Sequence, residues 1–525
     1  MELINKVIAF VFSVTVLSNT LLGGGLIWND AHLAEWRDRA VNGPYKSAGD
    51  SFDPLIPGEW DRIVTNKNTF ASNPSADRKS TITIGGTSGE TFIQNHKTLV
   101  DAAFYALVKE DAIVAAQVRA EVLWHARESG LQISPTLFQE TDDENWWNGA
   151  WIVRFVIAAD FIKDSFTAGE LTEVKDWVSD WAHSCEFSIN TELKKNFSNR
   201  TDRNYTTGLL RSATTAWYET GYAYKDASGV LHNRIGNLAR WYNNRRAGIM
   251  QFVGVASVFL DDAVLKDRAK LFFEEWIRFS VYPDGSVGEY ERNGGYGDPM
   301  AGLTYNGYNL ESALTVAEAL RLDGDPGLYT YSTTEGLWNT QCTTEPAKTL
   351  KLVVDTHFDL IEHEKLWYLD SGSIIASDLI DNKNETSGVH WVNDIWFAPI
   401  GNRYWKDSRI LAGYRRENTG SIAYSNPISS SGPYGTPWKG FQHSWPSMLF
   451  MFADMENVGT GTVTPPVIPP AGPVYPQGYR EATVGGQLVF GLDPVWGAGR
   501  EFEAVFDGDP STFYDYKNGD ETFVG

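Results

Sequence analysis

The sequence predicts a mainly α protein, in which an (α/α) toroid or incomplete barrel of helical hairpins is followed by a short segment of β-like character. Three observations predict this fold class. Apolar residues recur with the 3.6-residue period of amphipathic helices throughout residues 27–458. Polar loops rich in glycine and asparagine separate these stretches. Strands do not alternate with the helices, which argues against a parallel α/β sheet.

Four stretches show the helical period most clearly, and each places its apolar residues on one face. They are Leu99–Leu107, Ile152–Ile162, Leu265–Phe279 and Leu310–Leu320. The region between about residues 350 and 450 is less periodic, and it mixes β-branched runs such as Leu350–Val354 with loops. Many amphipathic helices over a region of this length suit a toroid built from helical hairpins.

The N-terminus has the pattern of an export signal, which we expect to cover residues 1–25. Lys6 precedes the apolar run Val7–Leu17, and the small residues Gly23–Gly25 follow. The run is too short to cross a bilayer and has the length of a signal-peptide core. We therefore expect a secreted, extracellular protein (periplasmic in a bacterium) without a membrane span.

The C-terminal part is divided from the helical domain, residues 26–458, by a linker at residues 459–473 that is rich in Pro, Thr and Gly. Residues 474–525 contain β-like runs such as Gln487–Phe490 and Glu503–Phe506. The segment Val505–Asp515 resembles the early strands of discoidin-like β-sandwich modules. That resemblance implies a partial, truncated carbohydrate-binding module, because such modules are more than twice this length.

Composition excludes some classes of function. The formal net charge of -23 and the lack of a basic run argue against a nucleic-acid partner. Aromatic residues make up 13% of the chain, which suits stacking on sugar rings as well as packing in a large core. Cys185 and Cys342 are too few for a disulfide framework, and whether they pair stays open. There is no phosphate-binding glycine loop, no zinc-spaced Cys/His cluster and no Gly-x-Ser-x-Gly motif, so we expect no metal or other cofactor.

Two segments carry the strongest functional signal: Trp241–Gly248, just before a helical stretch, and Gly302–Leu310, at the start of another. The pair resembles the Asn-Asn-His and Tyr-His-Asn-Tyr segments of alginate lyases of polysaccharide lyase family 5, and of their relatives in family 38. Both belong to the chondroitin AC/alginate lyase superfamily. Further stretches within residues 30–330 fit the same pattern: Glu35–Lys46, Glu59–Ile63 and Asp284–Arg292. Members of this superfamily are (α/α) toroids with a cleft across one end.

The resemblance implies a polysaccharide lyase that cleaves a uronic-acid polymer by β-elimination, most naturally polymannuronate (alginate) with glucuronan as a close second, and that acts as a monomer. Such an enzyme removes the proton at C5 of a uronate and expels the O4-linked sugar. The proton is weakly acidic because its removal adds charge beside the carboxylate. Amide and guanidinium groups that neutralise this carboxylate are therefore the main electrostatic requirement. A tyrosine can take the proton and return it to the leaving oxygen.

By this resemblance, Tyr305 is the base and acid, and Asn244, with Asn243 beside it, binds the carboxylate. Arg292 is the cation expected to lower the pKa of the tyrosine. Arg245 stands where family 5 has histidine, so we expect it to act as a neutralising cation instead of a neutral histidine base. The neighbouring Arg246 is expected to add to the basic cleft that a polyanion requires.

Other candidate substrate-binding residues are less specific to the resemblance. Trp146, Trp147 and Trp151 follow an acidic helix start and suit either the floor of a sugar subsite or core packing. Arg203, in a polar loop, is expected to line the cleft.

Alternative interpretations stay open at this point. Asn-Asn pairs usually cap helices or form turns, and Tyr305 at a helix start is also explained by packing. A glycoside hydrolase on a similar toroid would need two carboxylates across the scissile bond, for example Asp143 and Glu289. A non-catalytic glycan-binding protein is the third interpretation. Elimination gives an unsaturated uronate that absorbs in the near ultraviolet, and hydrolysis does not.

Overall fold

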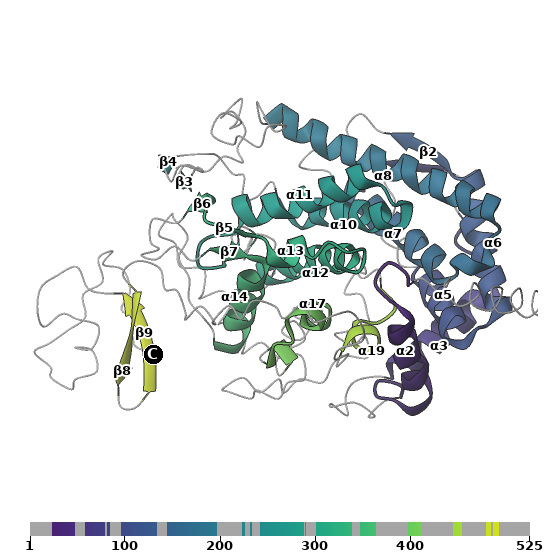
Figure 1. Cartoon of the computed structure of the whole chain (residues 1–525), viewed down its shortest axis with the longest axis horizontal. Coiled ribbons are helices and arrows are strands. Elements are labelled where there is room, and N and C mark those ends of the chain that lie inside the picture. The colour runs from purple at the N-terminus through teal and green to yellow at the C-terminus, as the bar shows by residue number, and fades with distance from the viewer. Residues whose placement is uncertain are drawn as a thin grey trace, which may run out of the picture.

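The computed structural model is mainly helical, as the sequence predicts (Figure 1). It describes residues 24–47, 58–78, 81–84, 96–133, 144–196, 223–225, 231–233, 242–287, 289, 301–338, 347–363, 397–408, 410–411, 445–453, 479–484 and 487–492.

The described part of the chain contains helices from near its beginning to Phe452. They are α2 (Asp30–Asn42), α3 (Glu59–Ser72), α5 (Lys97–Lys109), α6 (Ala112–Glu128), α7 (Glu144–Phe161), α8 (Ala168–Asn196), α10 (Asn244–Leu260), α11 (Ala263–Ser280), α12 (Ala301–Leu322), α13 (Gly327–Thr330), α14 (Leu350–His363), α17 (Ala398–Trp405) and α19 (Met448–Phe452).

The strands are short and form small separate sheets within the described residues. A parallel pair consists of β1 (Thr81–Ile84) and β2 (Gly130–Ile133). The other sheets are antiparallel: β4 (Leu231–Asn233), β3 (Ala223–Lys225) and β6 (Gly336–Trp338) in that order, β5 (Ser332–Thr333) with β7 (Lys348–Thr349), and β8 (Tyr479–Val484) with β9 (Gln487–Leu492).

The four periodic stretches are confirmed as helices, in α5, α7, α11 and α12; only Ile162, the last residue of the second stretch, lies beyond its helix. The β-like run Gln487–Phe490 is confirmed as part of β9, whereas Val505–Asp515 lies outside the described residues. The β-branched run Leu350–Val354 is the beginning of α14. Its Leu350, Val353 and Val354 share one buried helical face with Phe358, so burial of that face outweighs the β preference of valine.

Two tight turns with the same chemistry build the helical hairpins α5–α6 and α10–α11. Glu110 and Asp261 end the first helices in the left-handed conformation, at φ 55° and 57°. The next residues, Asp111 and Asp262, cap the following helices by accepting two backbone N–H bonds each. Such short connections make the second helix run back along the first.

Helices α10 and α12 pack against each other and run parallel. Ser312 Oγ lies 3.4 Å from Gln251 Oε1. Farther along both helices, Gly254 lies against Val316, so closely that an added Cβ would be 2.5 Å from Val316 Cγ2. Because residue numbers rise together across the interface, the two helices point the same way.

Helices α5 and α7 extend this parallel row. His96 and Phe104 of the α5 region contact Phe155 and Phe161 of α7, with ring centroids 5.1 and 5.2 Å apart. Gly149 of α7 packs against Ile249 of α10, and the far ends of α7, α10 and α12 line one cavity through Asp160, Phe259 and Leu322. The N-terminal ends of α7, α10 and α12 therefore gather at one end of the helical row.

Helix α8 runs opposite to α10, since Thr172–Ser179 near its start meet Leu260 at the end of α10. The observed layout is thus a row of parallel helices, α5, α7, α10 and α12, connected by helices that return. The closed toroid remains a prediction.

The N-terminal segment is anchored to α7. Asp160 Oδ2 accepts hydrogen bonds from Leu26 N (3.0 Å) and Trp28 Nε1 (2.9 Å). Lys163 Nζ donates to Gly24 O at 2.8 Å, so the last two residues of the expected leader, Gly24 and Gly25, lie against the helices. Cys185 is buried and unpaired, and Cys342 lies outside the described residues. Among the helices described here, none combines the length and the apolar character that crossing a membrane would require.

We predict that Gly254→Ala lowers the free energy of unfolding by about 1–3 kcal/mol, because the new methyl group would overlap Val316. In a Val316→Ala background the same change should cost clearly less, since the two overlapping methyl groups are gone. Chemical denaturation of the four proteins measures this coupling.

The control is Gly169→Ala in α8, where nothing lies within 4 Å of an added Cβ. This change should be neutral or slightly stabilising. Equal costs for Gly254→Ala in both backgrounds would show that α10 and α12 do not meet in this register.

Candidate functional site

The start of α10 is fixed by two side chains. Asn243 is the N-cap, and its Oδ1 accepts hydrogen bonds from Arg245 N at 3.2 Å and Arg246 N at 3.3 Å. The buried Asn244 donates its backbone N–H to Glu289 Oε1 at 2.9 Å. Asn243 therefore caps the helix, which confirms the capping interpretation for this member of the Asn-Asn pair. The cap uses the Oδ1 of Asn243 and not its Nδ2 group.

The register of α10 and α12 brings Tyr305 level with Asn244. Ser312 lies opposite Gln251. Counting back seven residues, roughly two turns, along both helices leads to Tyr305 and Asn244. The two predicted motifs therefore lie at the same level, at the beginnings of two parallel helices that touch each other. Tyr305 and Asn244 are sixty-one positions apart in the sequence.

Tyr305 is half buried and packs against the apolar core, so packing accounts for part of its environment. The next residue, Asn306, is fully buried and its Nδ2 lies 3.1 Å from His357 Nδ1. His357 comes from α14, where its ring meets Phe397 edge-on at 5.4 Å. The contact adds a buried imidazole to the site that the sequence analysis did not single out.

The two arginines that follow Asn244 differ in exposure. Arg245 is half buried, whereas Arg246 is buried, with only 4% of its surface exposed. Trp146 and Trp147 belong to the first turn of α7, at the same end as Tyr305, but their side chains lie outside the described residues. Arg292 and Arg203 also lie outside them.

Trp151 is a core residue and not part of an exposed sugar subsite. It is fully buried and its ring lies 4.6 Å from Phe155 and 6.0 Å from Trp181. Its Nε1 donates to His96 Nδ1 at 3.2 Å. Core packing therefore explains Trp151, because the helical period turns its side chain toward α5 and α8.

Glu289, a candidate acid for the hydrolase interpretation, is buried and receives the N–H of Asn244. Glu289 therefore satisfies one of the free backbone N–H groups at the start of α10, which is a supporting role for the helix. Its expected partner, Asp143, lies outside the described residues.

The interior next to the site is polar. Arg154 of α7 is fully buried, and burial lowers its pKa to about 10 against the opposing effect of Asp101 and Glu311. Gln251, Asn309 and Ser312 are also buried, between α10 and α12. Buried polar groups of this density are expensive unless they are paired or serve a function.

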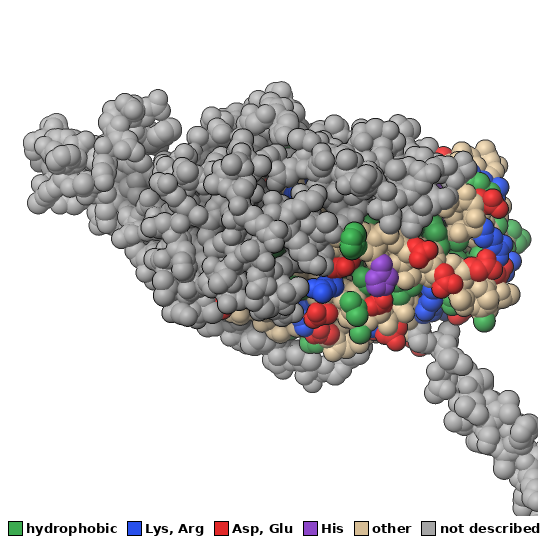
Figure 2. All heavy atoms as spheres, turned by 90° about the horizontal axis from the view of Figure 1, so that it is seen from above, with side chains coloured by type: hydrophobic (Ala, Val, Ile, Leu, Met, Phe, Trp, Pro, Cys, Tyr) green, Lys and Arg blue, Asp and Glu red, His purple; other side chains and the backbone are tan. Residues whose placement is uncertain are grey.

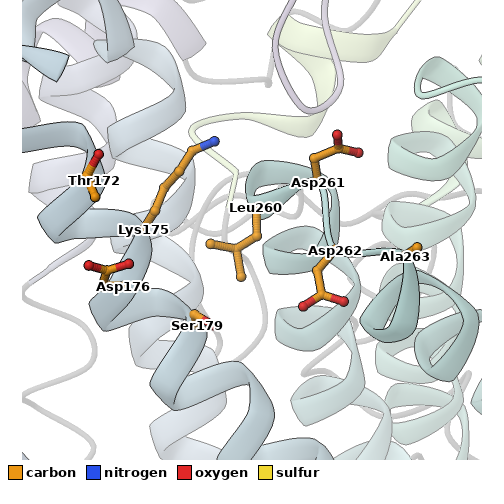
Figure 3. Close-up of a pocket in the computed structure, with 8 residues that line it drawn as sticks. All are labelled: Thr172, Lys175, Asp176, Ser179, Leu260, Asp261, Asp262 and Ala263. Carbon is orange, nitrogen blue, oxygen red and sulfur yellow. The ribbon is translucent and has the colours of Figure 1, made fainter. Parts of the chain in front are cut away.

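Two cavities in the described part lie at the opposite end of the helices. One, about 510 Å³, opens between α8 and the α10–α11 turn, with Lys175 beside Asp176, Asp261 and Asp262 (Figure 3). The other, about 390 Å³, contains Asp160 and Lys175. Both lie beside the C-terminal end of α10 and the first half of α8. In the first, three carboxylates surround one lysine, which does not suit a polyanion.

On the face in Figure 2, acidic and basic side chains are interspersed over the described residues. No group of three or more His, Cys, Asp and Glu side chains in the described ranges is arranged to bind a metal ion.

In comparisons with known proteins, no family model matches the chain, and no curated protein matches it either.

We predict that Asn243→Ala lowers the free energy of unfolding by about 1 kcal/mol, whereas Asn243→Asp retains stability, because aspartate caps equally well and favours the helix N-terminus. Urea denaturation measures both. Asp262→Ala, which removes the cap of α11, is the matched control and should cost a similar amount. A neutral Asn243→Ala would show that the two cap hydrogen bonds contribute nothing.

Proposed function

We propose that this chain is a polysaccharide lyase that cleaves a uronic-acid polymer by β-elimination at the N-terminal ends of α10 and α12. The observation that carries the proposal is the parallel register that brings Asn244 level with Tyr305. The same residue types in the same order led to the resemblance with the alginate lyases. A carboxylate-binding amide and a tyrosine hydroxyl at one end of neighbouring helices are the minimum that such a reaction needs.

In the proposed mechanism the uronate carboxylate binds at the start of α10, where the Nδ2 of Asn243, the Asn244 side chain and the Arg245 guanidinium neutralise it. Negative charge grows there as the C5 proton leaves, so these groups stabilise the transition state more than the ground state. Tyr305, as tyrosinate, takes the C5 proton and passes it to O4 of the leaving sugar. Arg292 remains the proposed cation that favours the tyrosinate.

The helix arrangement supports binding of an anion at this end. The N-terminal ends of α7, α10 and α12 each carry roughly half a positive charge. A chain of net charge -23 requires such a local field before a polyanion can approach. Trp146 and Trp147, in the first turn of α7, are proposed to bind sugar rings there.

The wider proposal follows from the same resemblance. The parallel α5, α7, α10 and α12 with returning helices are consistent with an (α/α) toroid. The substrate is polymannuronate or glucuronan, the protein is secreted and monomeric, and the β8–β9 hairpin is part of a carbohydrate-binding β-sandwich.

Tyr305→Phe tests the proposal directly. It removes only the hydroxyl that moves the proton, so turnover should fall by roughly 10²–10⁴-fold with little change in stability. The assay follows near-ultraviolet absorbance of the unsaturated product on alginate, glucuronan and glycosaminoglycans. Retention of more than a tenth of wild-type turnover would overturn the role of Tyr305. Reducing ends without new absorbance would identify a hydrolase instead.

A second prediction concerns Arg245. Arg245→Ala should lower kcat as well as raise KM, because the charge that the guanidinium neutralises grows in the transition state. Arg245→His should recover part of kcat. Lys175→Ala, in the acidic cavity at the opposite end, is the control and should leave both constants unchanged. If Arg245→Ala changes KM alone, Arg245 only binds the substrate.

A further inference from the structure

A buried carboxylate holds the segment that precedes α2. Asp160, near the end of α7, is 5% exposed, and its Oδ2 accepts hydrogen bonds from the backbone N–H of Leu26 at 3.0 Å and from Trp28 Nε1 at 2.9 Å. Leu26 is buried as well. The backbone nitrogen of Leu26 therefore lies against a carboxylate oxygen inside the protein.

Lys163 supplies positive charge beside this carboxylate, but at a long distance. Its Nζ is 3.9 Å from Asp160 Oδ1 and donates to Gly24 O at 2.8 Å. Lys175 and Asp323, of opposite charge, line the cavity that also contains Asp160. Burial raises the pKa of the Asp160 carboxyl, although Lys163 and the two hydrogen bonds oppose this shift. Because a buried carboxylate is costly unless a cation is paired with it, another positive charge beside Asp160 would stabilise the folded chain.

The sequence places a processing site at the same nitrogen. Cleavage after an export signal favours small residues at the first and third positions before the cut. For a leader of residues 1–25 these are Gly25 and Gly23, whereas a cut one or two residues earlier would place leucine at the third position. Hydrolysis of the bond between Gly25 and Leu26 adds the hydroxyl of water to the Gly25 carbonyl carbon. The Leu26 nitrogen takes up protons and becomes an α-ammonium group, since an α-amine has a pKa of about 8.

We propose that removal of the leader at the Gly25–Leu26 bond creates an α-ammonium group that forms a buried ion pair with Asp160. This inference rests on the export that forms part of the proposed function, and it does not depend on the lyase chemistry. The Leu26 nitrogen already lies within hydrogen-bond distance of Oδ2. Cleavage therefore turns a bond from a neutral amide into a stronger one between two charged groups.

The ion pair would fasten more than one helix. Ile27, the residue after Leu26, accepts a hydrogen bond at its carbonyl oxygen from Arg403 Nη1 of α17 at 3.1 Å. Arg403 Nε in turn lies 3.3 Å from Glu318 Oε1 of α12. The start of the processed chain is thus connected to α7 on one side and to α17 and α12 on the other, so the folded protein becomes more stable once the leader is gone.

The first measurement locates the cut. The full chain is expressed with its own leader in a secreting host, and the exported protein is sequenced from its N-terminus. We expect Leu26 as the first residue. Another first residue, or an uncut chain, overturns the inference, whatever the protein does to a uronate polymer.

The second measurement isolates the charge by thermal unfolding. A chain that begins at Leu26 is compared with one that keeps residues 18–25, each with and without Asp160→Asn. Both hydrogen bonds to Asp160 end at Oδ2, so an asparagine oxygen in its place can accept both and only the charge is lost. Asp160→Asn should lower the Tm of the chain that begins at Leu26 by about 3 °C or more, and that of the longer chain much less. Equal changes in the two chains overturn the inference.

A third measurement needs no substitution and so does not depend on whether Asp160→Asn folds. The α-amine of the protein that begins at Leu26 is acetylated with a limiting reagent, and mass spectrometry of its N-terminal peptide gives the rate. An ammonium buried against a carboxylate should react roughly tenfold or more slowly in the folded protein than in denaturant, because each unit by which its pKa rises removes nine tenths of the reactive free amine. Equal rates in the two conditions overturn the ion pair.

Discussion

The close contact of Gly254 with Val316 is the constraint on which the rest of the site depends. It lets the Val316 side chain of α12 pack directly against the backbone of α10, and with the Ser312–Gln251 contact it fixes one parallel register. The direction of α12 is prepared by the α10–α11 turn, where Asp261 in the left-handed conformation and the cap Asp262 send the chain back. A slip of one turn would move Tyr305 by about 5 Å relative to Asn244, which is more than proton transfer tolerates.

Parallel packing gathers the N-terminal ends of α7, α10 and α12, with the run Asn243–Arg246, at one end of the helical row. The other end holds the C-terminal end of α10, the starts of the returning helices α8 and α11, and several carboxylates. At that end Lys266 lies 2.6 Å from Asp261 and 2.7 Å from Asp323, so its charge is paired with two carboxylates.

Periodicity was sufficient to predict α5, α7, α11 and α12, because burial of one apolar face determines each of them, but it did not predict α14. It could not predict the juxtaposition of Asn244 and Tyr305, which depends on the missing side chain of a single glycine. His357 gave no signal either, since it is a lone histidine in a run whose valines suggested β structure, and only the packing of α14 brings it to Asn306. Trp151 illustrates the opposite case, in which a sugar-binding residue type is turned into the core by the helical phase.

Buried polar side chains along α12 connect this helix to several other segments. Near its C-terminal end, Glu318 is held by Arg321 at 2.8 Å and Arg403 at 3.3 Å, and although burial alone would raise the pKa of Glu318, these guanidinium groups shift it downward. Arg403 also donates to Ile27 O, so this end of the helix ties the N-terminal segment to the core. Toward Tyr305 the pairing becomes incomplete at Asn309. Buried charges must be paired to be tolerated, whereas a neutral amide can stay unpaired at modest cost. The charged residue Glu318 is accordingly paired twice, and the unpaired side chain is an amide.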